Sequence, residues 1–247
     1  VTLNTLKGVN YDRILQIWKE RYANPGQFVY YFVGNFDEAA LRPLIEKYIA
    51  SLPKGKAENW KDVPGFAAGK IENRFTRKSE TPKAIAFELW HAPMAYTVEN
   101  SVLTDAAAQV LSMVYLKSIR EDASAAYSVS AGGGLQRRGD KAVAIIQGYC
   151  PMDPNKSDLA LKLLAEGMKD NTVKMDADKV QKVKDFMLKN AELSAKNNGH
   201  WMDILDEYIW TGVDLQTGYK AAVEALTPAR LAAHLKQLVA AGNHAEV

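Results

Sequence analysis

Cysteine is almost absent from this 247-residue sequence, in which Cys150 is the only one. A single cysteine excludes an intrachain disulfide and a zinc site built from cysteines. Long apolar runs are also missing, because the longest, Phe28–Val33, is far shorter than the roughly 18 residues that a membrane span requires. The chain opens without the charged and apolar segments of a secretory signal. We therefore expect no membrane span and leave the compartment open.

An excess of charge of either sign is absent as well. Lysine and arginine number 31 against 29 acidic residues, and the formal net charge is only +2. The charges are spread along the chain, which argues against a nucleic-acid partner. With 47% hydrophobic and 24% charged residues, the composition is that of a globular chain with a sizeable core and one or two domains.

The first quarter of the sequence predicts a helix, a strand and a second helix. Residues 11–22 carry apolar side chains at helical spacing, and Asn24-Pro25-Gly26 ends that helix. Residues 27–34 are aromatic and β-branched, as in a buried strand. Residues 35–49 again show an apolar helical stripe. The segment Ser51–Phe66 contains two prolines and two glycines with mixed charge, which indicates a linker.

The remainder of the chain predicts a sheet followed by helices. Residues 71–77 and 84–90 resemble strands, and residues 98–117 form a long apolar helix. Two further strands, 127–132 and 142–149, are expected to pair through a Gly/Arg loop. Helices are then expected at about 157–170, 176–196, 200–210, 216–225 and 227–240, before a final strand that begins at His244. This order predicts an α+β sandwich: an antiparallel-rich sheet with helices on one face.

A weak internal repeat links the two ends of the sequence. Thr5-Leu6 precedes a helix that ends at Asn24-Pro25-Gly26 and leads into an apolar segment. Leu226-Thr227-Pro228 likewise precedes a helix that ends at Gly242-Asn243 and leads into a strand. Such a repeat indicates a shared supersecondary unit. We therefore expect residues 1–53 to be the tail of one domain and the rest of the chain to form a second, related domain.

The segment from Ile119 to Ser130 carries the most specific chemical signal. Arg120-Glu121 ends an apolar helix, and Tyr127 follows seven residues after the arginine. A neutral tyrosine hydroxyl can donate to an oxyanion, and the guanidinium fork suits peptide carbonyls or a carboxylate. The structural alternative is an arginine that offsets the helix dipole and a tyrosine packed at the sheet edge.

This segment resembles the R-E-x5-Y-S-V segment of the insulinase/pitrilysin-type zinc metallopeptidases, the inverzincins. Residues 11–53 resemble another family segment, with Gly34-Asn35-Phe36-Asp37 and Leu52-Pro53 at the expected places. The resemblance implies a processing-peptidase-like α+β fold divided into a domain tail (1–53), a linker (54–66) and a C-terminal domain (67–247). It also implies that Arg120 and Tyr127 hold the backbone of a peptide substrate opposite the zinc.

The zinc motif of that family, H-x-x-E-H, does not occur in this sequence. The resemblance therefore implies a zinc-free part of a metalloendopeptidase, inactive alone, whose zinc lies in an N-terminal half or a separate subunit. Two alternatives stay open, a structural subunit of the same fold and a peptide-binding subunit acting in trans. Bacterial members of the family suggest a periplasmic or cell-envelope location.

Other candidate sites are weaker. His200, Asp203, Asp206 and Glu207 share a helix and could hold a metal, but a solvated or interface face is the simpler interpretation. Gly132-Gly133-Gly134 lacks the lysine of a phosphate loop, and a glycine run in a strand indicates a bulge or the close approach of another backbone. Cys150 is interpreted as a buried thiol.

Overall fold

The computed structural model describes residues 2–56, 58–59, 65–138 and 141–247. The chain forms two compact units, residues 1–61 and residues 62–247, and each is described by itself. The second unit contains the sheet and the Arg120–Tyr127 segment. None of the helices in the described ranges combines the length and the hydropathy that a bilayer crossing requires.

The second unit is built on a five-stranded sheet with the strand order β1-β5-β2-β4-β3. Strands β1 and β5 are parallel, and all other neighbours are antiparallel. The antiparallel-rich α+β class predicted from the sequence is therefore confirmed. The strands are β1 (Lys70–Glu72), β2 (Ala84–Pro93), β3 (Ser130–Arg138), β4 (Lys141–Met152) and β5 (Asn243–Glu246).

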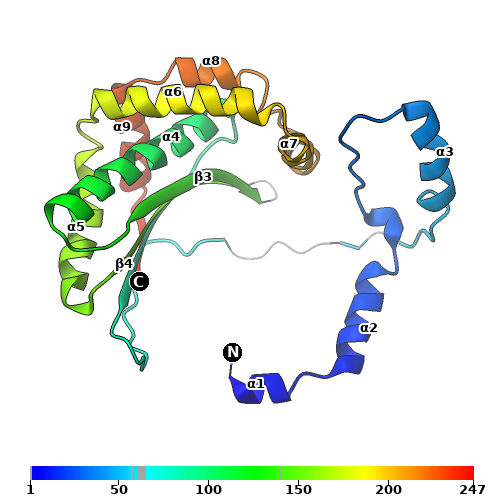
Figure 1. Ribbon diagram of the computed structural model, residues 1–247, viewed down its shortest axis with the longest axis horizontal. Coiled ribbons are helices and arrows are strands. Elements are labelled where there is room, and N and C mark those ends of the chain that lie inside the picture. Colours follow the sequence, from blue (N-terminus) through cyan, green and yellow to red (C-terminus); the bar gives the residue numbers. More distant parts are fainter. Residues whose placement is uncertain (1, 57, 60–64, 139–140) are drawn as a thin grey trace. The chain divides into compact units, whose positions relative to one another are not determined.

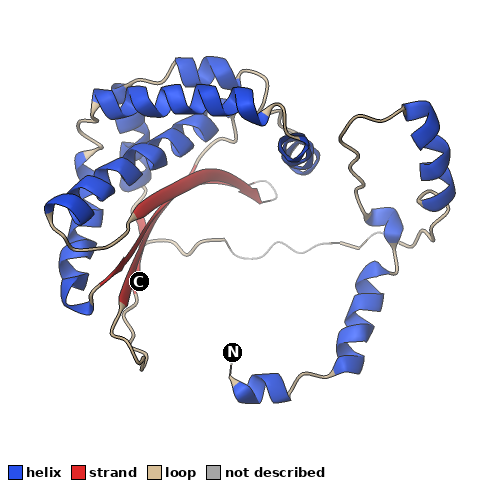
Figure 2. Ribbon diagram, in the orientation of Figure 1, coloured by secondary structure: helices blue, strands red, loops and turns tan. Residues whose placement is uncertain are grey.

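Helices cover one face of this sheet (Figures 1 and 2). Side chains of Thr97, Asp176 and Thr227 cap the N-termini of α4, α6 and α9, as their residue types favour. The helices α4, α5 and α9 pack directly on the strands. The helical elements are α4 (Val98–Tyr115), the π-helix η2 (Leu116–Asp122), the 3₁₀ turn η3 (Pro154–Lys156), α5 (Ser157–Asp170), α6 (Ala177–Ser194), α7 (Asn198–Thr211), α8 (Tyr219–Glu224) and α9 (Pro228–Ala240).

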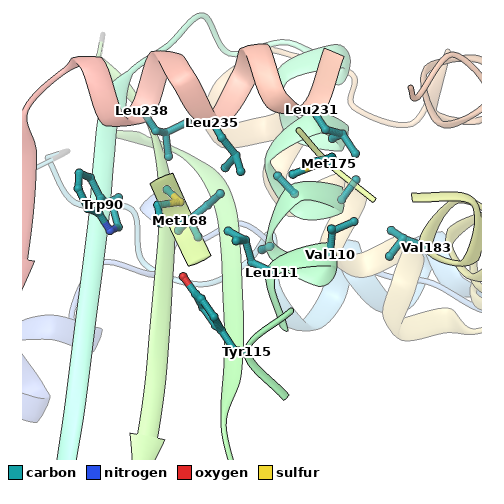
Figure 3. Packing of buried hydrophobic residues seen from close by; sticks show 14 of the residues in the cluster. Trp90, Val110, Leu111, Tyr115, Met168, Met175, Val183, Leu231, Leu235 and Leu238 are labelled. Atoms are coloured by element: carbon teal, nitrogen blue, oxygen red, sulfur yellow. The ribbon is translucent and has the colours of Figure 1, made fainter. Parts of the chain in front are cut away.

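Helix α4 runs through the middle of the hydrophobic core (Figure 3). Val110 and Leu111 are fully buried, as are Leu231, Leu235 and Leu238 of α9. Burying each such side chain contributes about 1.5–3 kcal/mol relative to leaving it exposed. The α4 helix therefore lies between other helices and the sheet, and its position fixes where the chain leaves toward Arg120.

One buried polar pair joins the neighbouring strands β5 and β2. His244 of β5 and Glu88 of β2 are 8% and 2% exposed, and His244 Nε2 lies 2.9 Å from Glu88 Oε1. The His244 ring also stacks on Trp90, with the ring centroids 4.0 Å apart. The pairing of β5 with β2 brings these two residues together, although they are 156 positions apart in the sequence.

The first unit contains α1 (Leu3–Lys7), α2 (Tyr11–Tyr22), the 3₁₀ turn η1 (Pro25–Gln27) and α3 (Glu38–Tyr48). The strand predicted at residues 27–34 is wrong: the described residues of this unit form no strand. A strand requires a neighbour for its hydrogen bonds, and this unit provides none. None of the described residues 2–56 and 58–59 is buried.

Several predicted boundaries in the second unit are also corrected. Strand β1 is much shorter than the predicted 71–77, because its partner β5 is itself four residues long. The glycines 132–134 lie within β3 and not in a loop, since β3 pairs with β4 along its full length. The predicted linker falls partly on residues 57 and 60–64, which lie outside the described residues, and its remaining residues form neither helix nor strand.

Candidate functional site

The chain leaves α4 through a π-helical turn that places Arg120 at the surface. Ile119, the preceding residue, is fully buried and anchors the turn in the core. The Ser118 hydroxyl donates to the Val114 carbonyl at 3.0 Å, and Lys117 pairs with Asp122 at 2.8 Å. π-helical turns are rare and are frequent at functional sites, because they change the direction in which side chains project. Arg120 is exposed on the last part of this turn.

A short, well-anchored loop follows the π-helical turn. The Ala123 and Ala125 amides donate to the carbonyls of Ser118 and Ile119, at 3.1 and 2.8 Å. Ser124 adopts a left-handed conformation, φ 46°, which non-glycine residues rarely adopt. The loop therefore turns sharply back toward Ser118 and Ile119.

Buried residues on both sides of Tyr127 hold its backbone while its side chain projects into solvent. Ala125 and Val129 are 2% and 7% exposed, whereas Tyr127 is 89% exposed. Ala126 forms an isolated bridge with Met152 at the end of β4. Tyr127 precedes the first residue of β3, Ser130, so the prediction that it opens a strand is wrong. The bridge at Ala126 is out of register with the β3–β4 pairing, and the chain between them does not continue the ladder.

The structure brings the two predicted site residues together. The guanidinium carbon of Arg120 lies 6.0 Å from the centroid of the Tyr127 ring, which is the outer range of a cation–π contact. Within the described residues, no carboxylate pairs with Arg120 and no group bonds the Tyr127 hydroxyl. Both groups therefore keep their hydrogen-bonding capacity for a molecule outside this chain.

A cavity of about 480 Å³ lies against the Tyr127 loop. Its wall combines small loop residues with the end of β4, including Ser128 and Pro151. Asp153 and Lys156 place a carboxylate and an ammonium on the same wall. The sequence reasoning missed these two residues, because no local pattern marks them and only the Ala126–Met152 bridge brings them beside the loop.

Two histidines of the second unit, His91 and His234, contact groups within the fold. His91 contacts the carbonyl of Ala67 at 3.1 Å and the ring of Phe66. His234 lies 2.9 Å from Thr104 Oγ1, and burial lowers the pKa of His234 to about 4. His234 is therefore neutral at pH 7.

The four residues considered as possible metal ligands lie on α7: His200, Asp203, Asp206 and Glu207. His200 Nε2 is buried without a hydrogen-bond partner among the described residues, and its ring lies edge-on to Trp201. Asp206 accepts from the Trp210 indole at 3.0 Å, and Glu207 accepts from the Tyr96 hydroxyl. The described ranges contain no group of three or more metal-ligating side chains. The donors in the described part of the chain therefore do not fit a zinc site.

Burial also makes the Cys150 thiol unreactive. The thiol is buried in β4, and this burial raises its pKa to about 11. A thiol with so high a pKa is a poor nucleophile at neutral pH, because the thiolate is the reactive form.

Comparison with known proteins places the chain in a family. A family profile described as the peptidase M16 inactive domain matches residues 8–187. No curated protein sequence matches the chain.

Three solved structures illustrate the likeness in fold. The ferredoxin protease FusC, in complex with Arabidopsis ferredoxin, is 18% identical with a TM-score of 0.79, covering 100% of this chain and 27% of that one. The periplasmic protease PqqL from Escherichia coli is 18% identical with a TM-score of 0.63, covering 86% of this chain and 24% of that one. A chain of complex III2 from Candida albicans is 15% identical with a TM-score of 0.61, covering 86% of this chain and 52% of that one.

The chain thus spans about a quarter of the length of the two proteases. At these identities the solved structures show a shared fold, and the match over residues 8–187 shows the family. The chain belongs to the peptidase M16 family and matches its inactive domain.

Proposed function

We propose that this chain is the substrate-binding, zinc-free part of a zinc-dependent metalloendopeptidase. The observation that carries the proposal is the Arg120–Tyr127 pair, two adjacent, exposed polar side chains held on a buried framework beside a cavity. A side chain that is 89% exposed contributes little to the core. The buried residues on both sides of Tyr127 hold its backbone, and an exposed side chain on an anchored loop supports a role in binding.

The chemistry of each group supports a different role in holding a peptide. Tyr127 offers one neutral O–H donor, which suits the oxygen that becomes negatively charged when a peptide carbonyl is attacked. Arg120 offers several N–H donors in a planar fork, which suits peptide carbonyls or a terminal carboxylate. In this proposal Arg120 positions the peptide and Tyr127 stabilises the developing charge. The attacking water and its metal belong to the zinc-bearing half or subunit.

The division of the chain fits a position within a longer protein. The first unit exposes most of its large apolar side chains, among them Ile14, Trp18 and Tyr22 of α2. Surface of this kind is normally covered by another part of a protein. We take residues 1–53 as the tail of a preceding peptidase-like domain, residues 54–66 as a linker, and residues 67–247 as the domain that holds substrate.

The proposal is tested by expressing the complete reading frame that contains this chain and measuring bound zinc and peptide hydrolysis together. We expect zinc bound outside this chain, hydrolysis by the complete protein, and none by residues 1–247 alone. A complete protein that binds no zinc and cleaves no peptide would refute the proposal.

A structural or partner subunit is the second candidate function. The observation that favours it is the likeness to a chain of complex III2. In that role the Arg120–Tyr127 pair would be dispensable. Replacing both residues would then leave assembly and function unchanged, whereas the enzyme proposal requires a loss of activity.

A further inference from the structure

The cavity beside the Tyr127 loop presents several hydrogen-bond donors that have no partner within the chain. Besides Tyr127 itself, its wall includes Ser124, Ser128 and Lys156. Neither serine hydroxyl group forms a hydrogen bond with another of the described residues. The two hydroxyl groups and the lysine ammonium can therefore all donate to a group that enters the cavity.

Lys156 supplies the unpaired charge of this wall. Its backbone amide donates to the Asp153 carbonyl at 2.9 Å, and this hydrogen bond closes the turn η3 that carries it. Its side chain is exposed. The ammonium forms no ion pair with a carboxylate in the described ranges. It is therefore available to a molecule outside the chain.

The acidic residues nearest to Lys156 in the sequence have other partners. Asp153 Oδ1 accepts from the Asn155 amide at 2.8 Å and so caps η3. Asp158, two residues after Lys156, pairs with Arg74 at 2.8 Å. The cavity wall thus combines a free positive charge with a carboxylate that already accepts one hydrogen bond. This balance favours a negatively charged ligand group.

Buried residues fix the two sides of the cavity relative to each other. Ala125 of the loop and Met152 of β4 are 2% and 7% exposed. The Ala126–Met152 bridge joins the loop to the end of β4, which leads directly into η3. The volume of about 480 Å³ lies in the range of about 300–1,000 Å³ that is typical of ligand cavities.

We propose that this cavity receives an acidic side chain of the peptide that Arg120 and Tyr127 hold, and that Lys156 determines the preference for it. The carboxylate accepts from the ammonium and from the serine hydroxyl groups, and hydrogen bonds between charged partners are stronger than neutral ones. An amide side chain of the same shape lacks the charge. The inference rests on the proposed function, because it takes the bound peptide to be the substrate.

The test measures the binding of two short peptides to the 247-residue chain. Both are acetylated and amidated, and they differ only in a central glutamate or glutamine among alanines. Amide chemical shifts, followed by NMR during titration, report the affinity and the site together. We expect the glutamate peptide to bind about fivefold more tightly, the effect of one exposed charge pair. The shifts should concentrate at residues 124–128 and 152–156.

Three comparisons assign the preference to Lys156. Lys156→Glu should reverse it, so that a peptide with a central lysine binds more tightly than the glutamate peptide. Lys189→Glu makes the same charge change on α6, outside the cavity wall, and should keep the glutamate preference. A glutamine peptide with a free carboxyl terminus tests whether the end of a chain supplies the carboxylate, and it should bind no better than its amidated form.

Four results would overturn the proposal: no binding, equal binding of the glutamate and glutamine peptides, a preference that survives Lys156→Glu, or a gain from the free terminus. Hydrolysis by the complete protein separates this inference from the proposed function. Cleavage without a glutamate preference would refute the role of Lys156 and leave the proposed function standing. A glutamate preference in binding, in a complete protein that cleaves no peptide, would support the cavity as a binding site and refute the proposed function.

Discussion

The guanidinium of Arg120 lies over the ring of Tyr127, 6.0 Å from its centroid, although the two residues are seven positions apart in the sequence. Three local features bring them together: the π-helical turn, the left-handed Ser124 and the buried anchors Ile119 and Ala125. Because both side chains are exposed, replacing either should leave the stability of the domain nearly unchanged. Effects on activity can then be interpreted as lost contacts with substrate.

Arg120→Lys, made in the complete protein that contains this chain, should show whether substrate binding depends on the positive charge of Arg120 or on its planar guanidinium. Lysine keeps the positive charge but lacks the planar fork, so we expect KM for a peptide substrate to rise by about tenfold, with a larger rise for Arg120→Ala. Steady-state kinetics on one fluorogenic peptide measures both. Arg42→Lys, the same change on an exposed residue of α3, is the control. An unchanged KM in both Arg120 variants would remove Arg120 from substrate binding.

Gly133→Ala should destabilise the second unit, whereas Gly132→Ala should not. The new methyl group at position 133 would clash with the Ile145 carbonyl oxygen, which is backbone and cannot move alone. We expect the free energy of unfolding to fall by about 1–3 kcal/mol. At position 132 the methyl group meets open space, so the change should stay within about 0.5 kcal/mol. Urea denaturation measures both, and equal losses would contradict the described packing.

His234 should make stability depend on pH below neutrality. Burial lowers the pKa of His234 to about 4 in the folded state, against about 6.5 for an unperturbed histidine. Between these values only the unfolded chain binds the proton, so stability falls as the pH decreases from about 6.5 to about 4. Its contribution to that loss is about 3 kcal/mol.

His234→Gln should remove this contribution, which urea denaturation at pH 7 and pH 4.5 would measure. The difference in free energy of unfolding between the two pH values should be smaller in the variant than in the unsubstituted chain. An identical pH dependence in both proteins would show that His234 titrates normally in the folded state.

The first unit should be far less protected than the second in the isolated chain. Helix α2 has twelve residues and none of them is buried, and helices of about 12–15 residues are marginal in water without tertiary packing. Amide exchange in Tyr11–Tyr22 should therefore be complete while α4 is still protected. Equal protection in α2 and α4 would contradict the described exposure.

Local patterns were sufficient for most of the fold. Apolar periodicity located α2, α4, α6 and α9, because a helix that buries one face must repeat with the helical period. It failed at Phe28–Val33, whose β-branched and aromatic residues favour a strand although the described unit provides no partner strand. Strand formation depends on a neighbour, and local sequence does not encode one.

The candidate site likewise contains some residues that local sequence predicts and others that only tertiary contacts bring together. Arg120 and Tyr127 were predicted because a family motif spans them, and their proximity follows from local turns. Asp153 and Lys156 line the cavity beside the Tyr127 loop because the Ala126–Met152 bridge brings the end of β4 next to that loop. The His244–Glu88 pair likewise depends on the β2–β5 register. Contacts between distant segments of this kind have no signature within a short stretch of sequence.

The most direct test of the account is kcat for Tyr127→Phe in the complete, zinc-loaded parent enzyme. This change removes one hydroxyl group from a side chain that is 89% exposed, and folding should be unaffected. We expect kcat to fall by about 10–1,000-fold, because the variant lacks one donor to the developing oxyanion. Tyr48→Phe, which removes a hydroxyl group from an exposed tyrosine of α3, should leave kcat unchanged. An unchanged kcat for Tyr127→Phe would contradict the role given to this site.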